Sequence, residues 1–256
     1  MNGFAASFDG RVALVTGAGS GIGRASAAAF AAAGARVLVA DIDEEKGAAC
    51  ADELRHAGGQ AHFVRTDATR LDDVERAVRT AVRLWGRLDA AHNNVGGGLT
   101  HGDLTLDDEE GWRRTLDLNL TSIWRCLKAE LPQMLTQGRG AIVNTAAAAG
   151  FKVVDEAPPA YAVAKAGVIH LTRIAAVQYG RHGIRINGVS PGLTGTPAAT
   201  GSMSAEQATA VAARLHAIPR IGGADELACA VLWLCSDAAS FVTGVTLPVD
   251  GGMVAK

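Results

Sequence analysis

The stretch TGAGSGIG, at residues 16–23, decides the fold. It joins the apolar run RVALVTG (residues 11–17), which is typical of a buried strand, to the alanine-rich segment GIGRASAAAFAAAG (residues 21–34), which predicts a helix. Glycines at such a junction permit a tight turn, and the helix start points N–H groups and the positive end of its dipole at a pyrophosphate. The stretch therefore predicts a nucleotide-binding turn. Its candidate cofactor-binding residues are Gly17, Ser20, Gly21, Ile22 and Gly23.

The second predicted strand ends in an acidic residue that bears on the choice of cofactor. Asp41 closes the run ARVLVAD. Its carboxylate can accept hydrogen bonds from both hydroxyls of an adenosine ribose and would repel a 2′-phosphate, for which the neighbouring Ile42 offers no cation. The alternative role, capping the next helix, is better filled by Asp43. The sequence therefore predicts NAD as the cofactor and makes NADP the less favoured choice.

Strand-like and helix-like segments alternate along the whole chain. We expect strands at residues 11–17, 35–41, 61–67, 87–94, 141–145, 184–190 and 244–252, and helices at residues 21–34, 44–57, 71–85, 107–135 and 160–181. The strands do not alternate between apolar and polar residues, which is typical of a parallel sheet covered on both faces. Because no linker, charge block or repeat divides the chain, we expect one α/β domain over residues 1–256. Its predicted fold is a doubly wound (Rossmann) parallel sheet of about seven strands with helices on both faces.

Composition argues against several classes of function. The chain of 256 residues has a net charge of −2, which gives no basic surface for a nucleic acid. Its apolar runs are short or interrupted by glycine and charge, so we expect no membrane span. Residues 1–11 lack the pattern of a secretory signal, and the four cysteines form no CxxC pair, so we expect reduced thiols and a cytoplasmic protein. The seven histidines show no metal-ligand spacing, and we expect no metal.

The motif YAVAK, at residues 161–165, would place Tyr161 and Lys165 on one face of a helix. Such pairs are also common on solvated faces. An ordinary tyrosine, with a pKa of about 10, is a poor base at neutral pH. An ammonium about 4 Å away, at an effective dielectric constant near 20, favours the phenolate by about 4 kcal/mol, or roughly 3 pKa units before desolvation. We therefore expect Lys165 to lower the pKa of Tyr161, which would take a proton from an alcohol as hydride leaves for NAD, or return it in reverse.

With TGAGSGIG and YAVAK, the motif NNVG at residues 93–96 makes the sequence resemble the short-chain dehydrogenase/reductase family. The TGxxxGxG spacing matches this family rather than the GxGxxG of other Rossmann enzymes, and the resemblance covers nearly the whole chain, residues 9–253. Val95 departs from it, because the family usually has alanine there. The resemblance implies an oxidoreductase that interconverts a small secondary alcohol and a ketone.

The resemblance also implies roles for single residues. Lys165 would bind the nicotinamide ribose, and Asn119 would belong to a proton relay, unless it is only a polar residue at a helix kink. Asp67 would accept from the adenine amine, and Asn93 would shape the wall at the adenosine ribose unless it only belongs to an Asn–Asn turn. Thr196 would meet the nicotinamide carboxamide, unless it only caps a helix. The other cofactor-binding positions implied are Ala68, Tyr161, Pro191, Gly192 and Thr194.

Substrate binding and assembly follow from the resemblance only in outline. Residues 150–159 and a lid at residues 195–216 would line the substrate pocket, and the helices carrying Asn119 and Tyr161 would form dimer faces of a homotetramer. Asp155, Glu156 and His101 could approach the substrate, although such loop residues are more often simply solvated. The class of alcohol stays open.

The stretch NTAAAAG, at residues 144–150, departs from the family pattern. The family usually has N-x-S-S-x-x-G or N-x-A-S-x-x-G, and counting back from Gly150 places the catalytic serine at Ala147, with Ala148 the other candidate. Thr145 cannot replace it, because two residues along a strand are a shift of about 6.6 Å. Loss of one donor to a reacting oxygen typically costs about 10²–10³ in turnover.

Three explanations for this alanine remain open. They are an engineered Ser→Ala change, a natural enzyme that uses substrate or water groups instead of serine, and a nucleotide-binding scaffold that has lost turnover. Because Tyr161, Lys165 and Asn119 are all present, we expect a slow NAD-dependent alcohol dehydrogenase or ketone reductase, with the scaffold as the alternative.

Overall fold

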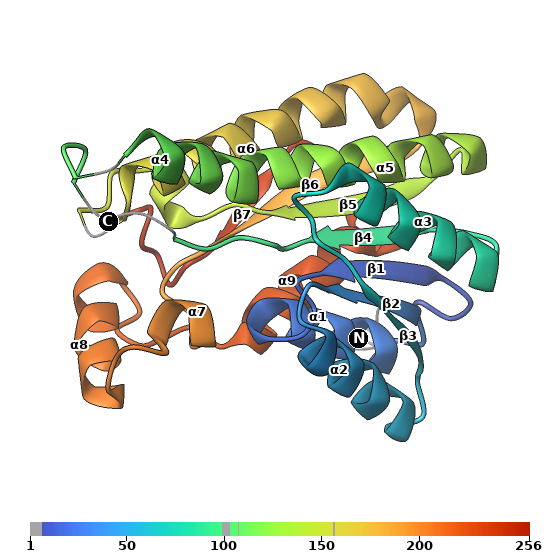
Figure 1. Ribbon diagram of the computed structural model, residues 1–256, viewed down its shortest axis with the longest axis horizontal. Helices are drawn as coiled ribbons and strands as arrows, with labels where there is room; N and C mark the ends of the chain where they lie inside the picture. Colours follow the sequence, from blue (N-terminus) through green and yellow to red (C-terminus); the bar gives the residue numbers. More distant parts are fainter. Residues whose placement is uncertain (1–6, 99–102, 107, 156) are drawn as a thin grey trace.

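Seven parallel strands form one sheet in the computed structural model, which describes residues 7–98, 103–106, 108–155 and 157–256. The strands are β1 (Val12–Thr16), β2 (Arg36–Asp41), β3 (Gln60–Arg65), β4 (Ala90–Asn93), β5 (Gly140–Thr145), β6 (Ile184–Pro191) and β7 (Thr246–Val249). Their order across the sheet is β3-β2-β1-β4-β5-β6-β7, and every neighbouring pair is parallel (Figure 1). The predicted doubly wound fold is confirmed.

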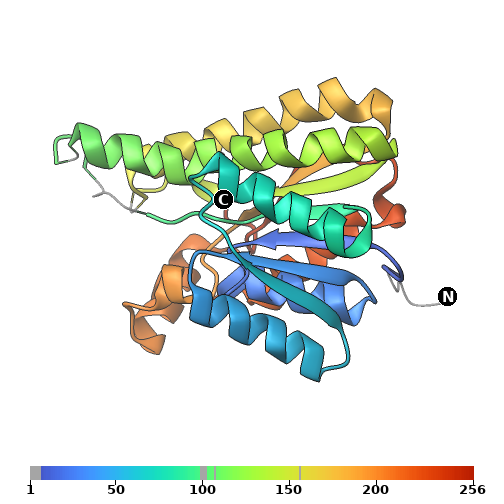
Figure 2. The same ribbon diagram turned by 45° about the vertical axis from the view of Figure 1, so that its right-hand side comes forward.

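Helices cover both faces of the sheet (Figures 1 and 2). One layer holds α1 (Gly21–Ala32), α2 (Glu44–His56) and α9 (Ala224–Cys235), and the other holds α3 (Leu71–Trp85), α4 (Glu109–Leu116), α5 (Ser122–Gln137) and α6 (Pro159–Tyr179). Two short helices, α7 (Pro197–Thr200) and α8 (Ala205–Leu215), follow β6 and fall within the predicted lid. Short 3-10 turns lie at Ala148–Gly150, Gly180–His182 and Asp237–Ala239.

The residues of β1 show why its sequence has no polar face. Val12 and Leu14 belong to the core beneath α3, α5 and α6, whereas Ala13 and Val15 belong to the core beneath α1 and α9. All four side chains are fully buried. Consecutive residues of a strand point to opposite faces, so a strand covered on both sides must be apolar throughout.

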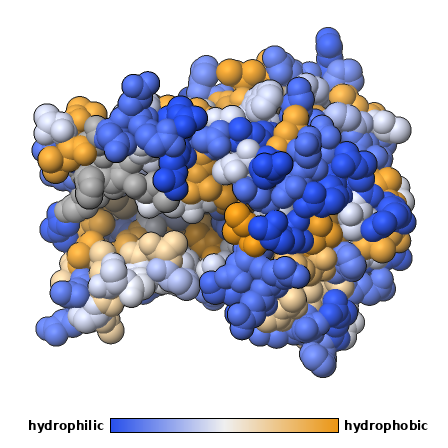
Figure 3. Space-filling model, in the orientation of Figure 1, coloured by the Kyte–Doolittle hydropathy of each residue, from blue (hydrophilic) through white to orange (hydrophobic). Residues whose placement is uncertain are grey.

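The strand order reverses between β1 and β4, which lie side by side in the sheet. The connections that follow these two strands lead to opposite sides of the sheet, and in such folds a crevice opens there, outside the carboxyl ends of the strands. The lid helices α7 and α8 lie beyond this edge, and the surface is hollowed between them and the α4 end of the other layer (Figures 1 and 3).

The helix predicted at residues 107–135 contains one wider turn. Residue 107 lies outside the described residues, and α4 follows Asp108, whose side chain caps it. A π-helical turn, Asp117–Thr121, then joins α4 to α5. Single π turns inside a helix leave backbone groups for other partners and often lie at functional sites.

One helix is both long and apolar. By length and composition alone, Pro159–His182 could cross a membrane, although Gly167 and Arg173 interrupt its apolar run. It is the one such helix among the described residues. Core helices pass the same test, and α6 packs on β6 and carries Lys165, whose side chain is fully buried.

Candidate active site

The carboxyl ends of the strands and the lid surround a cleft of about 660 Å³. The predicted site residues that line it are Gly17, Ser20, Gly21, Ile22, Asp41, Asp67, Ala68, Ala147, Tyr161, Lys165, Pro191, Gly192, Thr194 and Thr196. Gly23, Asn93 and Asn119 are not part of its lining. The doubly wound topology thus brings the turn before α1, the ends of several strands and one face of α6 to a single place.

The turn before α1 is shaped to receive an anion. Gly17 and Gly21 have φ angles of 63° and 52°, in the left-handed region that favours glycine. Ser20, at the N-cap, makes no side-chain hydrogen bond to the helix, and the first turn carries no acidic residue. The first N–H groups of α1 are therefore left without a side-chain cap beside the cleft, where they fit a pyrophosphate. Gly23 serves close packing, because a Cβ there would lie 2.1 Å from the carbonyl oxygen of Gly17.

Asp41 is held in place at the end of β2. Its Oδ2 accepts a hydrogen bond from the N–H of Gly19 at 2.7 Å, and its Oδ1 accepts one from the N–H of Asp43 at 2.9 Å. A carboxylate has about four acceptor positions, so this one keeps capacity for hydroxyl groups. Asp43 accepts from the N–H of Lys46 at 3.0 Å, which confirms it as the cap of α2.

Asp67 and Thr196 line the cleft with local partners of their own. Asp67, two residues beyond β3, accepts from the N–H and the hydroxyl of Thr69 at 2.9 and 2.6 Å. Thr196 accepts from the N–H of Ala199 at 3.2 Å and so caps α7. Each side chain is thereby oriented before any ligand is considered.

Asn93 lies behind the wall of the cleft, and the prediction that it shapes this wall is wrong. Its side chain is fully buried, and its Nδ2 donates to Glu130 at 3.1 Å and to Asn144 at 3.0 Å. The next residue, Asn94, lines the cleft instead, because consecutive residues of an extended strand point to opposite sides. Burial raises the pKa of the Glu130 carboxyl to about 7.

Tyr161 and Lys165 lie together in the cleft on one face of α6. The Lys165 ammonium is 5.6 Å from the centre of the Tyr161 ring and donates to the carbonyl oxygen of Thr145 at 2.8 Å. Burial lowers the pKa of Lys165 to about 8 and raises the pKa of Tyr161 to about 12. The expected lowering of the Tyr161 pKa is therefore wrong for this structure. The ammonium lies over the ring and binds a backbone carbonyl, and desolvation of the phenolate outweighs its charge.

Asn119 lies in the π turn, behind the floor of the cleft. Its side chain is fully buried, accepts from the N–H of Gly97 at 2.9 Å, and donates to the carbonyls of Gly97 and Thr115 at 2.8 and 3.0 Å. A Cβ on Gly96 would lie 2.7 Å from Oδ1 of Asn119 and 2.9 Å from Nζ of Lys165. The glycine of NNVG thus leaves the room in which Asn119 and Lys165 approach each other.

Ala147, rather than Ala148, faces the cleft. Ala147 is extended and lines the cleft together with Ala146, whereas Ala148 begins the 3-10 turn and is not in the lining. This placement agrees with the count back from Gly150. A glycine is needed at position 150, because a Cβ there would lie 2.7 Å from the backbone of Lys165. An alanine side chain offers no hydrogen-bond donor at this position.

A buried hydrogen-bond chain occupies the hydroxyl of Thr145. Nε2 of His92 is 2.9 Å from this hydroxyl, which in turn donates to Oδ1 of Asn94 at 3.3 Å. Burial lowers the pKa of His92 to about 3, so its imidazole is neutral. Thr145 is therefore structural, in line with the sequence-based expectation. No pattern in the sequence singled out His92, because a single histidine within an apolar strand is most simply a core residue.

The lid end of the cleft is mainly apolar. Its lining includes Leu118, Val154, Ala157, Pro158, Met203, Val211 and Leu215, and also Arg214. These residues carry no motif, although the spacing of Val211 and Leu215 on α8 is the i, i+4 signal of one helix face. Asp155 is exposed and does not line the cleft, and His101 and Glu156 lie outside the described residues. Within the described part of the chain, no group of three or more His, Cys, Asp or Glu side chains could hold a metal ion.

Comparison with known proteins gives matches over almost the whole chain. A family model described as enoyl-(acyl carrier protein) reductase matches residues 17–254. A cis-4-hydroxycyclohexanecarboxylate dehydrogenase from Sinomonas cyclohexanicum is 43% identical over 249 residues, covering 97% of this chain and 98% of that protein. A cyclohexanol dehydrogenase from Acinetobacter sp. is 41% identical over 252 residues, covering 97% of each chain.

A solved structure is similarly close. The crystal structure of carveol dehydrogenase from Mycobacterium avium, in complex with NAD, gives a TM-score of 0.93 at 30% identity and covers 98% of this chain and 100% of that one. The chain belongs to the short-chain dehydrogenase/reductase family, an oxidoreductase family that binds a nicotinamide cofactor. The cleft fits such a cofactor, because an uncapped helix start and a fixed carboxylate lie in the same cavity as the Tyr161–Lys165 pair.

Proposed function

We propose that this member of the family is an NAD-dependent oxidoreductase that interconverts a cyclic secondary alcohol and its ketone, at a rate that Ala147 reduces. The observation that carries the proposal is a single cleft that joins the glycine turn and Asp41 to Tyr161 and Lys165. In this proposal, residues 1–256 act as one domain and residues 195–216 are the substrate lid.

The preference for NAD rests on the surroundings of Asp41. Ser20 and Gly21 would hold the pyrophosphate through the first N–H groups of α1, and Asp41 would accept the hydroxyls of the adenosine ribose. A 2′-phosphate would meet this carboxylate at close range. The cation of Lys46 is paired with Asp43 at 2.6 Å, which leaves it poorly placed to neutralise such a phosphate.

Tyr161 would move the proton at the substrate oxygen. The bound cofactor takes a hydride from the carbinol carbon during oxidation and gives one to the carbonyl carbon during reduction. Tyr161 accepts the hydroxyl proton in the first direction and returns it in the second. A phenol with a pKa of about 12 needs help to lose its proton near neutral pH, and Lys165, with a pKa of about 8, can exchange protons in that range. Asn119 would continue this relay behind Gly96.

Ala147 is also the observation that favours the alternative, a nucleotide-binding scaffold with little turnover. Ala147 has no hydrogen-bonding group, and the ammonium of Lys165 can only donate. Of these three side chains, Tyr161 alone can both donate to and accept from the substrate oxygen. The buried ammonium of Lys165 supports the enzyme, because burial of a charge costs stability and a catalytic role would explain why the chain keeps it in the cleft.

The substrate class rests on the lid end of the cleft. Leu118, Met203 and Val211 give it an apolar lining, which suits a carbocyclic ring bearing one hydroxyl. The relatives named above are a cyclohexanol dehydrogenase, a cis-4-hydroxycyclohexanecarboxylate dehydrogenase and a carveol dehydrogenase, which supports the same class.

We also propose a homotetramer. Val163, Ile174 and Val177 lie on one face of α6 and are 52%, 43% and 85% exposed, and Trp124 on α5 is 45% exposed. Helices α5 and α6 run side by side in both views (Figures 1 and 2). An apolar surface of this kind supports association through these two helices.

The free cysteines support a cytoplasmic location as part of the proposal. Cys50, Cys126 and Cys235 are buried and Cys229 is exposed, and all four are unpaired. A reducing compartment preserves such thiols. The net charge of −2 gives no support for a nucleic-acid partner.

The test is the absorbance of reduced nicotinamide, measured with NAD and NADP on matched cyclic and acyclic secondary alcohols and ketones. We expect slow, NAD-dependent turnover that is fastest on the cyclic compounds. If this protein and its Ala147→Ser variant both bind NAD and neither turns over any compound, the scaffold is the better account.

A further inference from the structure

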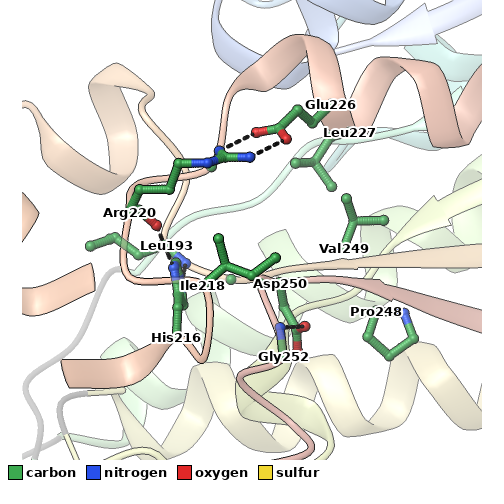
Figure 4. A pocket seen from close by; sticks show the side chains of 13 residues that line it. Leu193, His216, Ile218, Arg220, Glu226, Leu227, Pro248, Val249, Asp250 and Gly252 are labelled. Atoms are coloured by element: carbon green, nitrogen blue, oxygen red, sulfur yellow. Dashed lines mark hydrogen bonds and ion pairs between the residues drawn. The ribbon is translucent and has the colours of Figure 1, made fainter. Parts of the chain in front are cut away.

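One side chain joins the two ends of the lid beneath the cleft. The lid follows the loop at residues 191–194, which begins at Pro191, the last residue of β6, and the lid ends at His216, the C-cap of α8. His216 is 3% exposed. Its imidazole lies between Leu193 and the backbone of Arg220 (Figure 4).

The partners of His216 define its protonation. Nε2 is 3.0 Å from the backbone nitrogen of Leu193, and Nδ1 is 2.7 Å from the carbonyl oxygen of Arg220. The N–H of Leu193 can only donate and the carbonyl of Arg220 can only accept. In this arrangement Nε2 accepts from Leu193 and Nδ1 donates to Arg220, so the imidazole holds one partner with each nitrogen.

The loop that His216 holds lies between the cleft and a second cavity. Gly192 and Leu193 line the cleft and also this second cavity of about 280 Å³ (Figure 4). A Cβ on Gly192 would lie 2.7 Å from Nε2 of His216, so the ring is in direct contact with the loop. Further along, Gly222 donates to the carbonyl of Leu193 at 3.0 Å and accepts from Gly195 at 2.9 Å.

The other partner of His216, Arg220, has contacts of its own. The guanidinium of Arg220 makes two hydrogen bonds of 2.7 Å to Glu226, in the first turn of α9. Ile218 donates to the carbonyl of Gly251 at 2.8 Å. His216 therefore links the loop to a segment that is itself bonded to α9 and to the turn after β7.

We propose that His216 is a positioning residue that fixes the loop at residues 191–194 through the N–H of Leu193 and so sets the wall that this loop gives to the cleft. The inference rests on the proposed function, because this loop would face the nicotinamide. Loss of the bond to Leu193 would let the loop move into the cavity behind it. Loss of the bond to Arg220 would leave the loop itself in place.

Three substitutions separate the two bonds. In His216→Gln, the amide oxygen can still accept from Leu193, whereas in His216→Asn the shorter amide reaches only the carbonyl of Arg220. His216→Leu removes both bonds. His62→Leu, at an exposed position of β3, is the matched control. The first readout is the exchange rate of the Leu193 amide hydrogen in the absence of substrate, together with the thermal midpoint.

We expect exchange at Leu193 to rise at least about tenfold in His216→Asn and His216→Leu, and less than about threefold in His216→Gln and the control. In His216→Asn and His216→Leu, kcat/KM should also fall about three- to tenfold, whereas it should change less in His216→Gln and the control. The thermal midpoint should be the same in the Gln and Asn variants. If His216→Leu does not fold, the Gln and Asn pair decides alone. Equal exchange in these two variants, or rates that follow only the thermal midpoint, would overturn the inference. Amide exchange can be measured without substrate. If the variants show the expected exchange pattern but no turnover is found, the result would support the positioning role of His216 and count against the proposed function.

Discussion

At the proposed adenosine end of the cleft, the candidate binding groups are backbone N–H groups and carboxylates held by short hydrogen bonds. At the proposed reaction end, they are the long side chains of Tyr161 and Lys165. Asp41 is fixed by two backbone N–H groups. Tyr161 and Lys165 have pKa values that burial moves in opposite directions, to about 12 and about 8. Recognition at the first end depends on local geometry, and chemistry at the second depends on tertiary packing, so the two ends should respond differently to mutation.

The largest effect is expected for Tyr161→Phe, which removes the acid–base hydroxyl and keeps the ring. Turnover should fall by about 10²–10⁴. The affinity for NAD, measured by titration calorimetry, should change by less than about threefold, because the adenosine end is untouched. A variant that keeps its turnover would show that Tyr161 is not the proton donor or acceptor.

The next largest effect is expected for Ala147→Ser, which would add a donor beside the proposed position of the substrate oxygen. Initial rates should rise by about 10²–10³. Ala148→Ser is the control, since Ala148 does not line the cleft, and it should leave the rate unchanged. A larger gain from Ala148→Ser than from Ala147→Ser would show that the count back from Gly150 is wrong.

A third prediction concerns Glu130, which lies behind the cleft as the partner of Asn93. Burial raises its pKa from the ordinary 4.5 to about 7 in the folded state. As the pH rises from 4.5 to 7, the unfolded chain loses this proton before the folded protein does. Ionisation therefore stabilises the unfolded chain first, and the free energy of unfolding falls progressively over this range. Glu130→Gln should therefore gain about 2–3 kcal/mol of unfolding free energy relative to the parent between pH 4.5 and pH 8.

Urea unfolding of both proteins at several pH values measures this difference. Other titrating groups, such as the buried His92, cancel when the variant is compared with the parent at each pH. A difference that stays constant across this range would show that Glu130 ionises in the folded protein as it does in the unfolded chain.

The smallest effect is expected at the adenosine end. Asp41→Ser combined with Ile42→Arg removes the carboxylate and adds a cation for a 2′-phosphate. The ratio of kcat/KM for NADP to that for NAD should rise by about ten- to a hundredfold, the value of one or two charge-assisted hydrogen bonds. Ile42→Arg alone is the control and should give a smaller rise. An unchanged ratio in the double variant would remove Asp41 from cofactor selection.

The same contrast explains how much could be predicted from the sequence. Glycines mark places where the backbone needs a positive φ, as at Gly17 and Gly21, or a close approach, as at Gly96 and Gly150. These needs are local, so the motifs that contain them identify the fold, the turn before α1 and the position of Ala147.

Side-chain burial could not be predicted in the same way. Asn93 and Asn94 are chemically identical, and only the end of β4 decides that the first is buried and the second lines the cleft. The pKa of Tyr161 depends on how deeply α6 is packed, and the roles of His92 and His216 depend on partners distant in sequence. None of these features has a local pattern that the sequence could display.

The most direct test of the central claim is transfer of a label from substrate to cofactor. We would incubate the protein with NAD and cyclohexanol deuterated at the carbinol carbon, and measure the mass of the reduced nicotinamide. The account predicts deuterium in the reduced cofactor with this protein, more of it with Ala147→Ser, and at least about a hundredfold less in the same time with Tyr161→Phe. Two results would contradict hydride transfer in this cleft. One is reduced cofactor that carries no deuterium. The other is that neither this protein nor Ala147→Ser forms any reduced cofactor, although both bind NAD.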